Sequence, residues 1–243
     1  MLVLGIDTAT DTLALSLADG GISLGTLTLG GAKDRRPREH AESLLPAIDS
    51  LCKLAGFSPS DLDGIAVVKG PGGFTGIRTG LTVAKTVAQA LDIPLVGIPS
   101  LEAFVHAYPG IGLISPLLDA RREEVFAALF RKTPSGIETL VESAHFSLDQ
   151  WKEALSGYGE EILFIGEGAV RYGNKLAAPG RVPLGFTGSN LAILGEEKLV
   201  AGLRDDPLSL APDYQRLPSM VVAWKKKQDE QENKDKKDEK ISP

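Results

Sequence analysis

The sequence has little that would form disulfides or insert into a membrane. Its single cysteine, Cys52, cannot form a disulfide within the chain, so a reducing compartment is expected. Apolar runs stay well short of the roughly 18 residues that a membrane-spanning helix needs. The first basic residue is Lys33, so the amino-terminal segment lacks the positive region of a secretory signal. We therefore expect a soluble, cytoplasmic protein without membrane contact.

Histidine and net positive charge are scarce as well. The three histidines, at positions 40, 106 and 145, are far apart in the sequence, so no compact zinc site is predicted. The formal net charge is −6, and the segment 225–243, with seven lysines and six acidic residues, leaves −7 for the rest. Because affinity for nucleic acid depends largely on lysine and arginine, we expect another molecule to make most of any nucleic-acid contact.

What is present is typical of a globular α/β protein, with 43% hydrophobic and 24% charged residues. Short apolar runs separated by tight turns predict an antiparallel meander over residues 2–29. Apolar periodicity predicts helices over 39–55 and 75–91, and Pro46 predicts a kink or a late start of the first. Buried strands are expected after these helices, over 65–68 and 95–98. This order combines a meander with parallel crossovers.

The second half carries weaker signals of the same kind. Strands are predicted over 112–118, 124–130 and 162–165, and helices over 151–155 and 191–203. We divide the chain into modules of residues 1–107 and 108–218, between which no sequence repeat is detectable, and a charged tail of residues 219–243. Thirteen of the sixteen residues from 225 to 240 are charged, so this segment favours disorder over the alternative, a charged helix.

A glycine-rich turn at residues 70–76 (GPGGFTG) lies between a predicted strand and a predicted helix. Backbone amides at a helix amino terminus bind anions, so Gly70, Gly72 and Gly73 are candidates for a phosphate or nucleotide contact. The lysine of a P-loop is missing, and the dinucleotide pattern needs glycine where Thr75 stands. A purely structural turn is the alternative.

Two other turns allow two interpretations each. Asp7 and Thr8 follow the first strand, in a hairpin turn or in a loop that faces phosphates, as in actin-like ATPases and sugar kinases. Residues 119–122 (DARR) hold either a catalytic acid or the charged rim of a hairpin.

The helix at 75–91 carries a stripe of small residues. Gly76, Gly80, Ala84 and Ala88 recur every four positions and share one face. A glycine inside a helix costs about 1 kcal/mol, so we expect a compensating close contact with another helix. That helix belongs either to this chain, at 39–55, or to a partner.

Five segments together resemble the TsaB family, over about residues 1–218. They are LGIDTAT (4–10), GPGGFTGIRTG (70–80), IPSLEA (98–103), DARREEV (119–125) and PDYQRLP (212–218). The resemblance implies an actin-like (ASKHA) fold of two related modules. It also implies membership of the bacterial complex that makes N6-threonylcarbamoyladenosine at position 37 of tRNAs reading ANN codons, with TsaD and TsaE as partners and threonylcarbamoyl-AMP as donor.

The resemblance further implies a non-catalytic role. TsaD, which is similar to TsaB, has two metal-binding histidines where this sequence has Ser100 and Phe104, and neither side chain replaces an imidazole. The chain is then a scaffold without a cofactor of its own, in which Asp7, Thr8 and the turn glycines are vestigial. ATP or ADP would bind only within the assembled complex, and tRNA mainly through it.

Family members pair through two helices, with TsaD or, when alone, with a second copy. The interface candidates are Leu44, Leu45, Ile48, Leu51, Gly76, Gly80, Ala84 and Ala88, some of which must face the chain's own sheet. Ala84→Arg is expected to abolish pairing and to leave the monomer folded. The remaining alternatives are an independent ATP-dependent kinase or hydrolase of the same fold class and a metallopeptidase, which Ser100 and Phe104 oppose.

Overall fold

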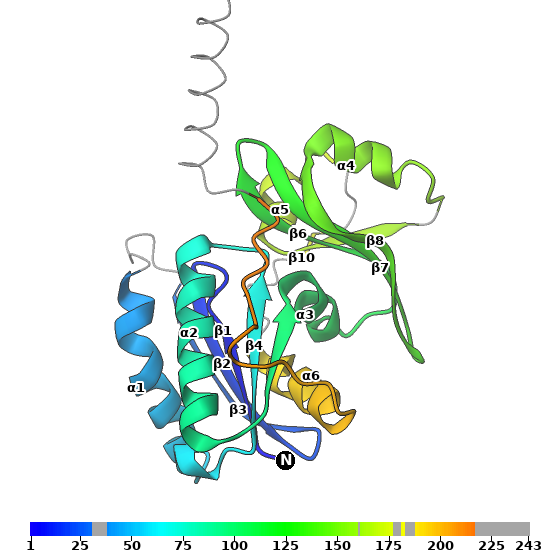
Figure 1. Cartoon of the computed structure of the whole chain (residues 1–243). Coiled ribbons are helices and arrows are strands. Elements are labelled where there is room, and N and C mark those ends of the chain that lie inside the picture. Colours follow the sequence, from blue (N-terminus) through cyan, green and yellow to red (C-terminus); the bar gives the residue numbers. More distant parts are fainter. Residues whose placement is uncertain (31–37, 160, 177–180, 183–187, 217–243) are drawn as a thin grey trace, which may run out of the picture.

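The structure, a computed structural model, describes residues 1–30, 38–159, 161–176, 181–182 and 188–216, without the side chains of 38–41, 181–182 and 188–189 (Figure 1). The first of its two five-stranded sheets has the order β3-β2-β1-β4-β5. Its strands are β1 (Val3–Asp7), β2 (Thr12–Asp19), β3 (Ile22–Gly30), β4 (Gly64–Gly70) and β5 (Leu95–Pro99). The first three strands form the predicted antiparallel meander, and β1, β4 and β5 are parallel.

The second sheet repeats this plan with the order β10-β9-β6-β7-β8. Its strands are β6 (Gly112–Arg121), β7 (Glu124–Thr133), β8 (Gly136–Ser147), β9 (Ile162–Ile165) and β10 (Arg181–Val182). Strands β6 to β8 are an antiparallel meander, and β9 pairs in parallel with both β6 and β10. The structure thus confirms an α/β protein of two related modules, although the two halves share no visible sequence repeat.

Six α-helices and one short 3-10 helix, η1 (Pro59–Asp61), are present in the described part of the chain. The α-helices are α1 (Arg38–Leu54), α2 (Phe74–Leu91), α3 (Ser100–Ala107), α4 (Leu148–Leu155), α5 (Glu167–Tyr172) and α6 (Gly188–Val200). Helix α1 begins well before Pro46, so the predicted late start is wrong. The predictions missed β8, β10, η1, α3 and α5, and the charged tail lies outside the described residues.

Helices cover both faces of each sheet, in layers that Figure 1 shows. Side chains of a strand alternate between faces. Accordingly, Ile6 of β1 lies beside Gly80 of α2, whereas Gly5 lies against Ala192 of α6. Helices α1 and α2 therefore cover one face of the first sheet and α6 covers the other. In the second sheet, α4 and α5 pack with Leu117 and Val125, and α3 packs on the opposite face.

The packing divides the chain differently from the predicted boundary at residue 107. Helix α6 comes late in the sequence, but its leucines complete the first core, and its buried Glu196 accepts hydrogen bonds from the amides of Gly20 (2.9 Å) and Gly21 (2.8 Å). Helix α3 comes early, but Leu101 and Phe104 belong to a core of the second sheet. The two modules exchange a helix, and α3 and α6 contact each other between the sheets.

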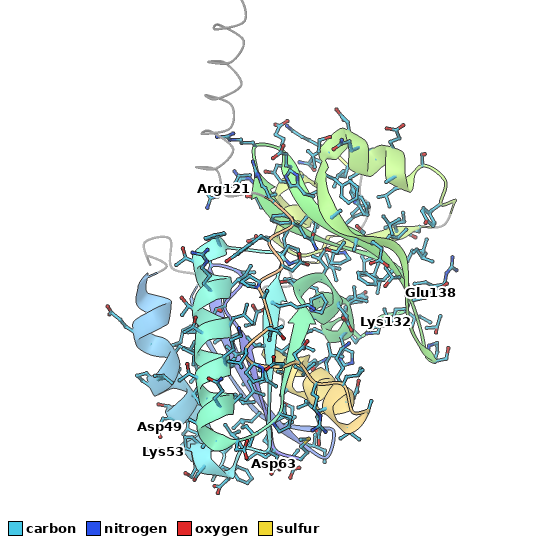
Figure 2. The ribbon with its side chains drawn as sticks, in the orientation of Figure 1. Asp49, Lys53, Asp63, Arg121, Lys132 and Glu138 are labelled. Atoms are coloured by element: carbon cyan, nitrogen blue, oxygen red, sulfur yellow. The ribbon has the colours of Figure 1, made fainter. Side chains whose placement is uncertain are left out.

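Lys132 of β7 fixes α3 against the second sheet (Figure 2). Its ammonium group donates hydrogen bonds to the carbonyl oxygens of Val105 (2.9 Å), His106 (3.2 Å) and Tyr108 at the carboxyl end of the helix. A cation at this end is favourable because the last carbonyls of a helix carry partial negative charge. Burial lowers the pKa of the Lys132 ammonium.

Candidate functional site: the glycine-rich turn and the outer helices

The glycine-rich turn after β4 packs directly against the turn between β1 and β2. The amide of Gly73 donates a hydrogen bond of 2.6 Å to the carbonyl oxygen of Ala9. A side chain at Gly72 would collide with that same carbonyl. The structure thus brings the two predicted phosphate-facing loops together, and here they bond to each other.

The stripe of small residues on α2 continues this contact. A side chain at Gly76 would collide with the carbonyl oxygen of Thr8, and one at Gly80 with the Thr8 hydroxyl. That hydroxyl donates a hydrogen bond of 2.7 Å to the carbonyl oxygen of Gly76. Ala84 and Ala88 are buried in the first core. The expectation that a helix packs against this stripe is therefore wrong: the stripe lets α2 approach β1 and its following turn.

Asp7 ends β1 and is 4% exposed. Its Oδ1 accepts a hydrogen bond of 2.9 Å from the amide of Ala9. Burial raises the pKa of the carboxyl group to about 6, against the smaller opposing effect of that hydrogen bond. Asp7 therefore titrates close to neutral pH, in a position where a charged group costs stability.

The equivalent turn of the second module, between β6 and β7, is a hairpin with a charged rim. Asp119 accepts hydrogen bonds of 2.8 Å from the amide of Arg121, 2.7 Å from the guanidinium of Arg171 and 2.7 Å from the hydroxyl of Tyr172. These bonds join α5 to the turn. Asp119 thus has a role in holding the hairpin, the second of its two predicted interpretations.

Ser100 and Phe104, which the resemblance places at metal-binding positions, are both buried residues of α3. The Ser100 hydroxyl donates a hydrogen bond of 2.6 Å to the carbonyl oxygen of Pro71, and Phe104 packs in the core with Phe126 and Phe130. Within the described ranges, no group of three or more histidine, cysteine, aspartate or glutamate side chains is placed to hold a metal ion.

The structure separates the eight interface candidates that periodicity could not. Leu44, Ile48 and Leu51 of α1 are buried in the first core, like the four small residues of α2, whereas Leu45 is 55% exposed. Ala84 has no exposed surface, so Ala84→Arg would place a guanidinium in the core. The expectation that this variant leaves the monomer folded is therefore wrong.

The side of α1 and α2 that faces away from the sheet carries exposed residues of both helices. The two helices contact each other and run side by side (Figure 1). We call this surface the outer face and define it by residues on both helices. They are Leu45 and Asp49 of α1 and Thr82, Val83 and Thr86 of α2, all of them exposed or half-buried.

A set of side chains near the carboxyl end of the described chain was not predicted. Tyr214 stacks on Phe74 of α2, with ring centroids 4.3 Å apart, and its hydroxyl accepts a hydrogen bond of 2.6 Å from Nε of Arg78. Arg216 pairs with Glu124 of β7 at 3.1 Å. Both residues lie in the segment 212–218 that carries part of the family resemblance, and this segment was the available signal.

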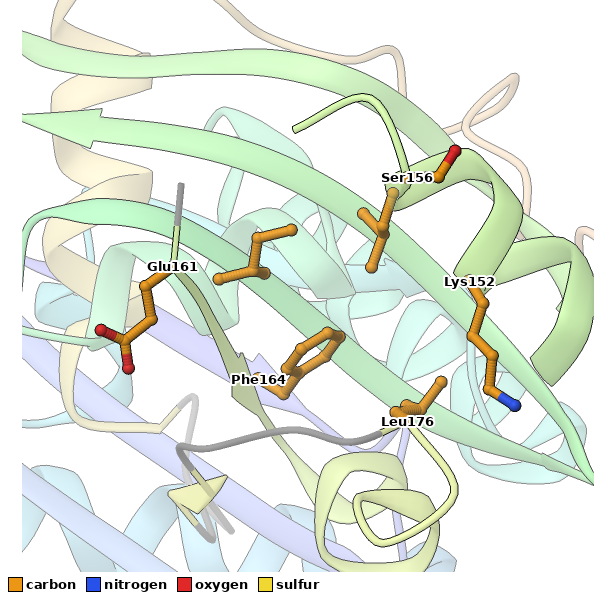
Figure 3. A pocket seen from close by; sticks show the side chains of 7 residues that line it. Lys152, Ser156, Glu161, Phe164 and Leu176 are labelled. Atoms are coloured by element: carbon orange, nitrogen blue, oxygen red, sulfur yellow. The ribbon is translucent and has the colours of Figure 1, made fainter. Parts of the chain in front are cut away.

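A separate pocket of about 300 Å³ lies between α4 and β9 (Figure 3). Leu155, Ile162, Phe164 and Leu176 supply its apolar part, and Lys152, Ser156 and Glu161 its polar rim. Lys152 is already paired with Asp149 at 3.3 Å. The pocket is remote in sequence from every predicted site residue.

Comparisons with known proteins agree with the resemblance. A family model described as TsaD, tRNA N6-adenosine threonylcarbamoyltransferase, matches residues 35–213. The tRNA threonylcarbamoyladenosine biosynthesis protein TsaB of Bacillus subtilis is 33% identical over 234 residues, which cover 92% of this chain and 98% of that protein. TsaB of Escherichia coli is 30% identical over 140 residues, 56% of this chain and 58% of that protein.

A solved structure supports the fold. A protein from Pseudomonas aeruginosa, described as similar to the peptidase YeaZ, superposes with a TM-score of 0.76 over 88% of this chain and 99% of its own, at 22% identity. The duplicated sheets agree with the expected actin-like architecture. No helix among the described residues is long and apolar enough to cross a membrane. Since the Bacillus subtilis protein aligns over nearly its whole length, the chain belongs to the TsaB family.

Proposed function

We propose that this chain is a non-catalytic subunit in the synthesis of threonylcarbamoyladenosine in tRNA. It binds a TsaD-type protein and supports transfer of the threonylcarbamoyl group from threonylcarbamoyl-AMP to N6 of adenosine 37. The name of the Bacillus subtilis relative supports the pathway, and the match to the TsaD family model supports a TsaD-type partner of related fold.

One observation carries the non-catalytic part of the proposal. Ser100 and Phe104 are both used in packing, one in a hydrogen bond to the glycine-rich turn and the other in an aromatic core. A phenyl ring and a hydroxyl oxygen do not supply the imidazole nitrogens that such a metal site needs. Catalysis then belongs to the TsaD-type partner.

The outer face of α1 and α2 is our candidate for the surface that binds this partner. It covers a sheet whose opposite face is already occupied by α6. Leu45 is its exposed large apolar residue on α1, and Val83 is half-buried on α2. Apolar side chains within a polar rim are typical of protein interfaces. A second copy of the chain would use the same surface when the partner is absent.

In this role the chain has no nucleotide site of its own. In the isolated protein the amide of Gly73 is bonded to Ala9, and Thr8 is bonded to Gly76. Groups that could meet a phosphate are thus engaged within the chain. ATP or ADP and TsaE act at the assembled complex, and tRNA is held mainly by the partner.

Charge substitutions on the outer face test the pairing. Leu45→Arg and Thr82→Arg place a guanidinium on an exposed surface, so each variant is expected to fold and to lose the complex with TsaD from the same organism. Leu208→Arg is the matched control, because Leu208 is 80% exposed and lies outside the outer face. Size-exclusion chromatography with light scattering measures the complex and any self-dimer.

The outcomes of this experiment separate the proposed surface from the alternatives. Loss of the complex in the two outer-face variants, with the control unchanged, supports the proposed surface. Folded outer-face variants that still elute with TsaD would contradict it. If the unmodified chain forms no complex, with or without ATP and TsaE, and instead hydrolyses ATP alone, the scaffold proposal fails and an independent enzyme takes its place.

A further inference from the structure

The segment 213–216 connects the two modules, and we call it the strap. Its first half is bound to the first module. The amide of Asp213 donates a hydrogen bond of 2.8 Å to the carbonyl oxygen of Lys69 at the end of β4. The Asp213 carbonyl lies where a side chain on Gly70 would be, and Gly70 has a φ of 116°, so glycine at this position permits the close approach.

Tyr214 anchors the strap to α2. Its ring lies 22° from parallel to that of Phe74, and the Arg78 guanidinium carbon lies 4.0 Å from the centre of the Phe74 ring. Together with the hydrogen bond from Arg78 to the Tyr214 hydroxyl, this gives a stack of two rings and a cation. Such aromatic and cation–π contacts are attractive, so they hold Tyr214 against α2.

The second half of the strap is bound to the second module. The side-chain amide of Gln215 donates a hydrogen bond of 2.8 Å to the hydroxyl of Ser143 on β8. Arg216 donates to the carbonyl oxygen of Ala120 on β6 and pairs with Glu124 on β7. Four consecutive residues thus bind β4 and α2 on one side and three strands of the other sheet on the other. The orange segment of Figure 1 runs between the two modules.

Helix α3 also connects the modules, with Ala103 in the first core, Leu101 in a core of the second sheet and Ser100 bonded to Pro71. Its contacts with α6 include side-chain ion pairs. Glu102 pairs with Lys198 at 2.8 Å, and His106 lies 3.3 Å from Glu197. Partly exposed ion pairs contribute little and tolerate small displacements. We propose that the strap fixes the angle between the two modules, with Tyr214 and Arg216 as its anchors.

Single-molecule fluorescence energy transfer on the isolated chain measures this angle. Dyes are attached at Thr28→Cys on β3 and Glu153→Cys on α4, both exposed positions, and the buried Cys52 remains unlabelled. The low concentration keeps the protein monomeric, and no partner is needed, so the outcome is independent of pairing with TsaD. The variant carries both Tyr214→Ala and Arg216→Ala, and Leu208→Ala is the control.

If the strap fixes the angle, the labelled chain and the Leu208→Ala control each give one narrow peak of transfer efficiency. Loss of both anchors is expected to broaden this peak or to shift it to a second population, while circular dichroism shows that the sheets remain folded. A folded double variant with an unchanged peak overturns the proposal. If the double variant does not fold, Arg216→Gln, which retains the Tyr214 stack, decides by the same criterion.

Discussion

Replacing Asp7 by asparagine should stabilise the protein at neutral pH and have little effect near pH 4. The carboxyl group is buried, and its pKa in the folded protein is about 6, compared with an ordinary value of 3.8. The difference of about two pH units corresponds to about 3 kcal/mol, at about 1.4 kcal/mol per unit, as the cost of keeping Asp7 charged. Asparagine keeps an acceptor for the Ala9 amide but adds an amino group that needs a partner, so we expect a gain of about 1–3 kcal/mol.

The pH dependence follows from the direction of the pKa change. Because folding raises this pKa, the folded state binds the proton more tightly than the unfolded state. Ionisation of Asp7 therefore lowers the stability of the wild-type protein as the pH rises from about 4 to about 6, and this effect is complete above about 6. Urea unfolding of wild type and Asp7→Asn at several pH values between 4 and 8 measures this. The difference between the two proteins isolates Asp7 from the other carboxyl groups.

Two outcomes would contradict this reasoning. One is a stability difference that does not change with pH, and the other is an asparagine variant less stable than wild type at pH 7.5. Asp11→Asn is the matched control, because Asp11 lies in the same turn with an exposed side chain and the substitution is expected to alter stability little. A confirmed gain would mean that the buried carboxylate of Asp7 destabilises the folded protein at neutral pH.

Two further predictions concern packing. Gly76→Ala should destabilise the protein by about 3 kcal/mol or more, because the new methyl group collides with the carbonyl of Thr8, whereas Gly157→Ala meets open space; thermal unfolding of both compares them. Equal stability of the two variants would contradict the close approach of α2. A fragment of residues 1–107 should lack cooperative thermal unfolding, because its sheet lacks α6, which supplies Leu191 to the first core. A soluble fragment that unfolds cooperatively would show that α6 is dispensable.

The fold class and most of the regular elements could be predicted from local patterns. The meander over residues 2–29 is confirmed, and the two long helices match their predicted ranges within about one residue. These elements have strong periodicity and clear boundaries, such as the turn that precedes α2. Strand β8 and helix α3 were missed because neither has comparable signals: β8 is an edge strand of mixed burial, and α3 follows β5 without an intervening loop.

The exchange of helices between the modules could not be predicted from periodicity. The apolar residues of α6 predict that the helix is buried, but they do not show which sheet it covers. The specific contacts are long-range ones, such as the bond from Glu196 to the turn at Gly20, which joins residues 176 positions apart. Such contacts form only because the chain returns to the first sheet after completing the second, and no local pattern shows this.

On α1 and α2, periodicity likewise could not show which of the interface candidates face the sheet. A helix that packs between its own sheet and a partner needs an apolar side for each of them. In the sequence, both sides appear as apolar residues spaced three and four positions apart. Leu44 and Leu45 are adjacent in sequence and differ only in direction from the helix axis, and this direction places one in the core and the other in solvent. The position of the sheet therefore decides which residues a partner can reach. It shifts the expected interface from the glycine–alanine stripe to the opposite side of the same helix, where Thr82 and Thr86 are exposed.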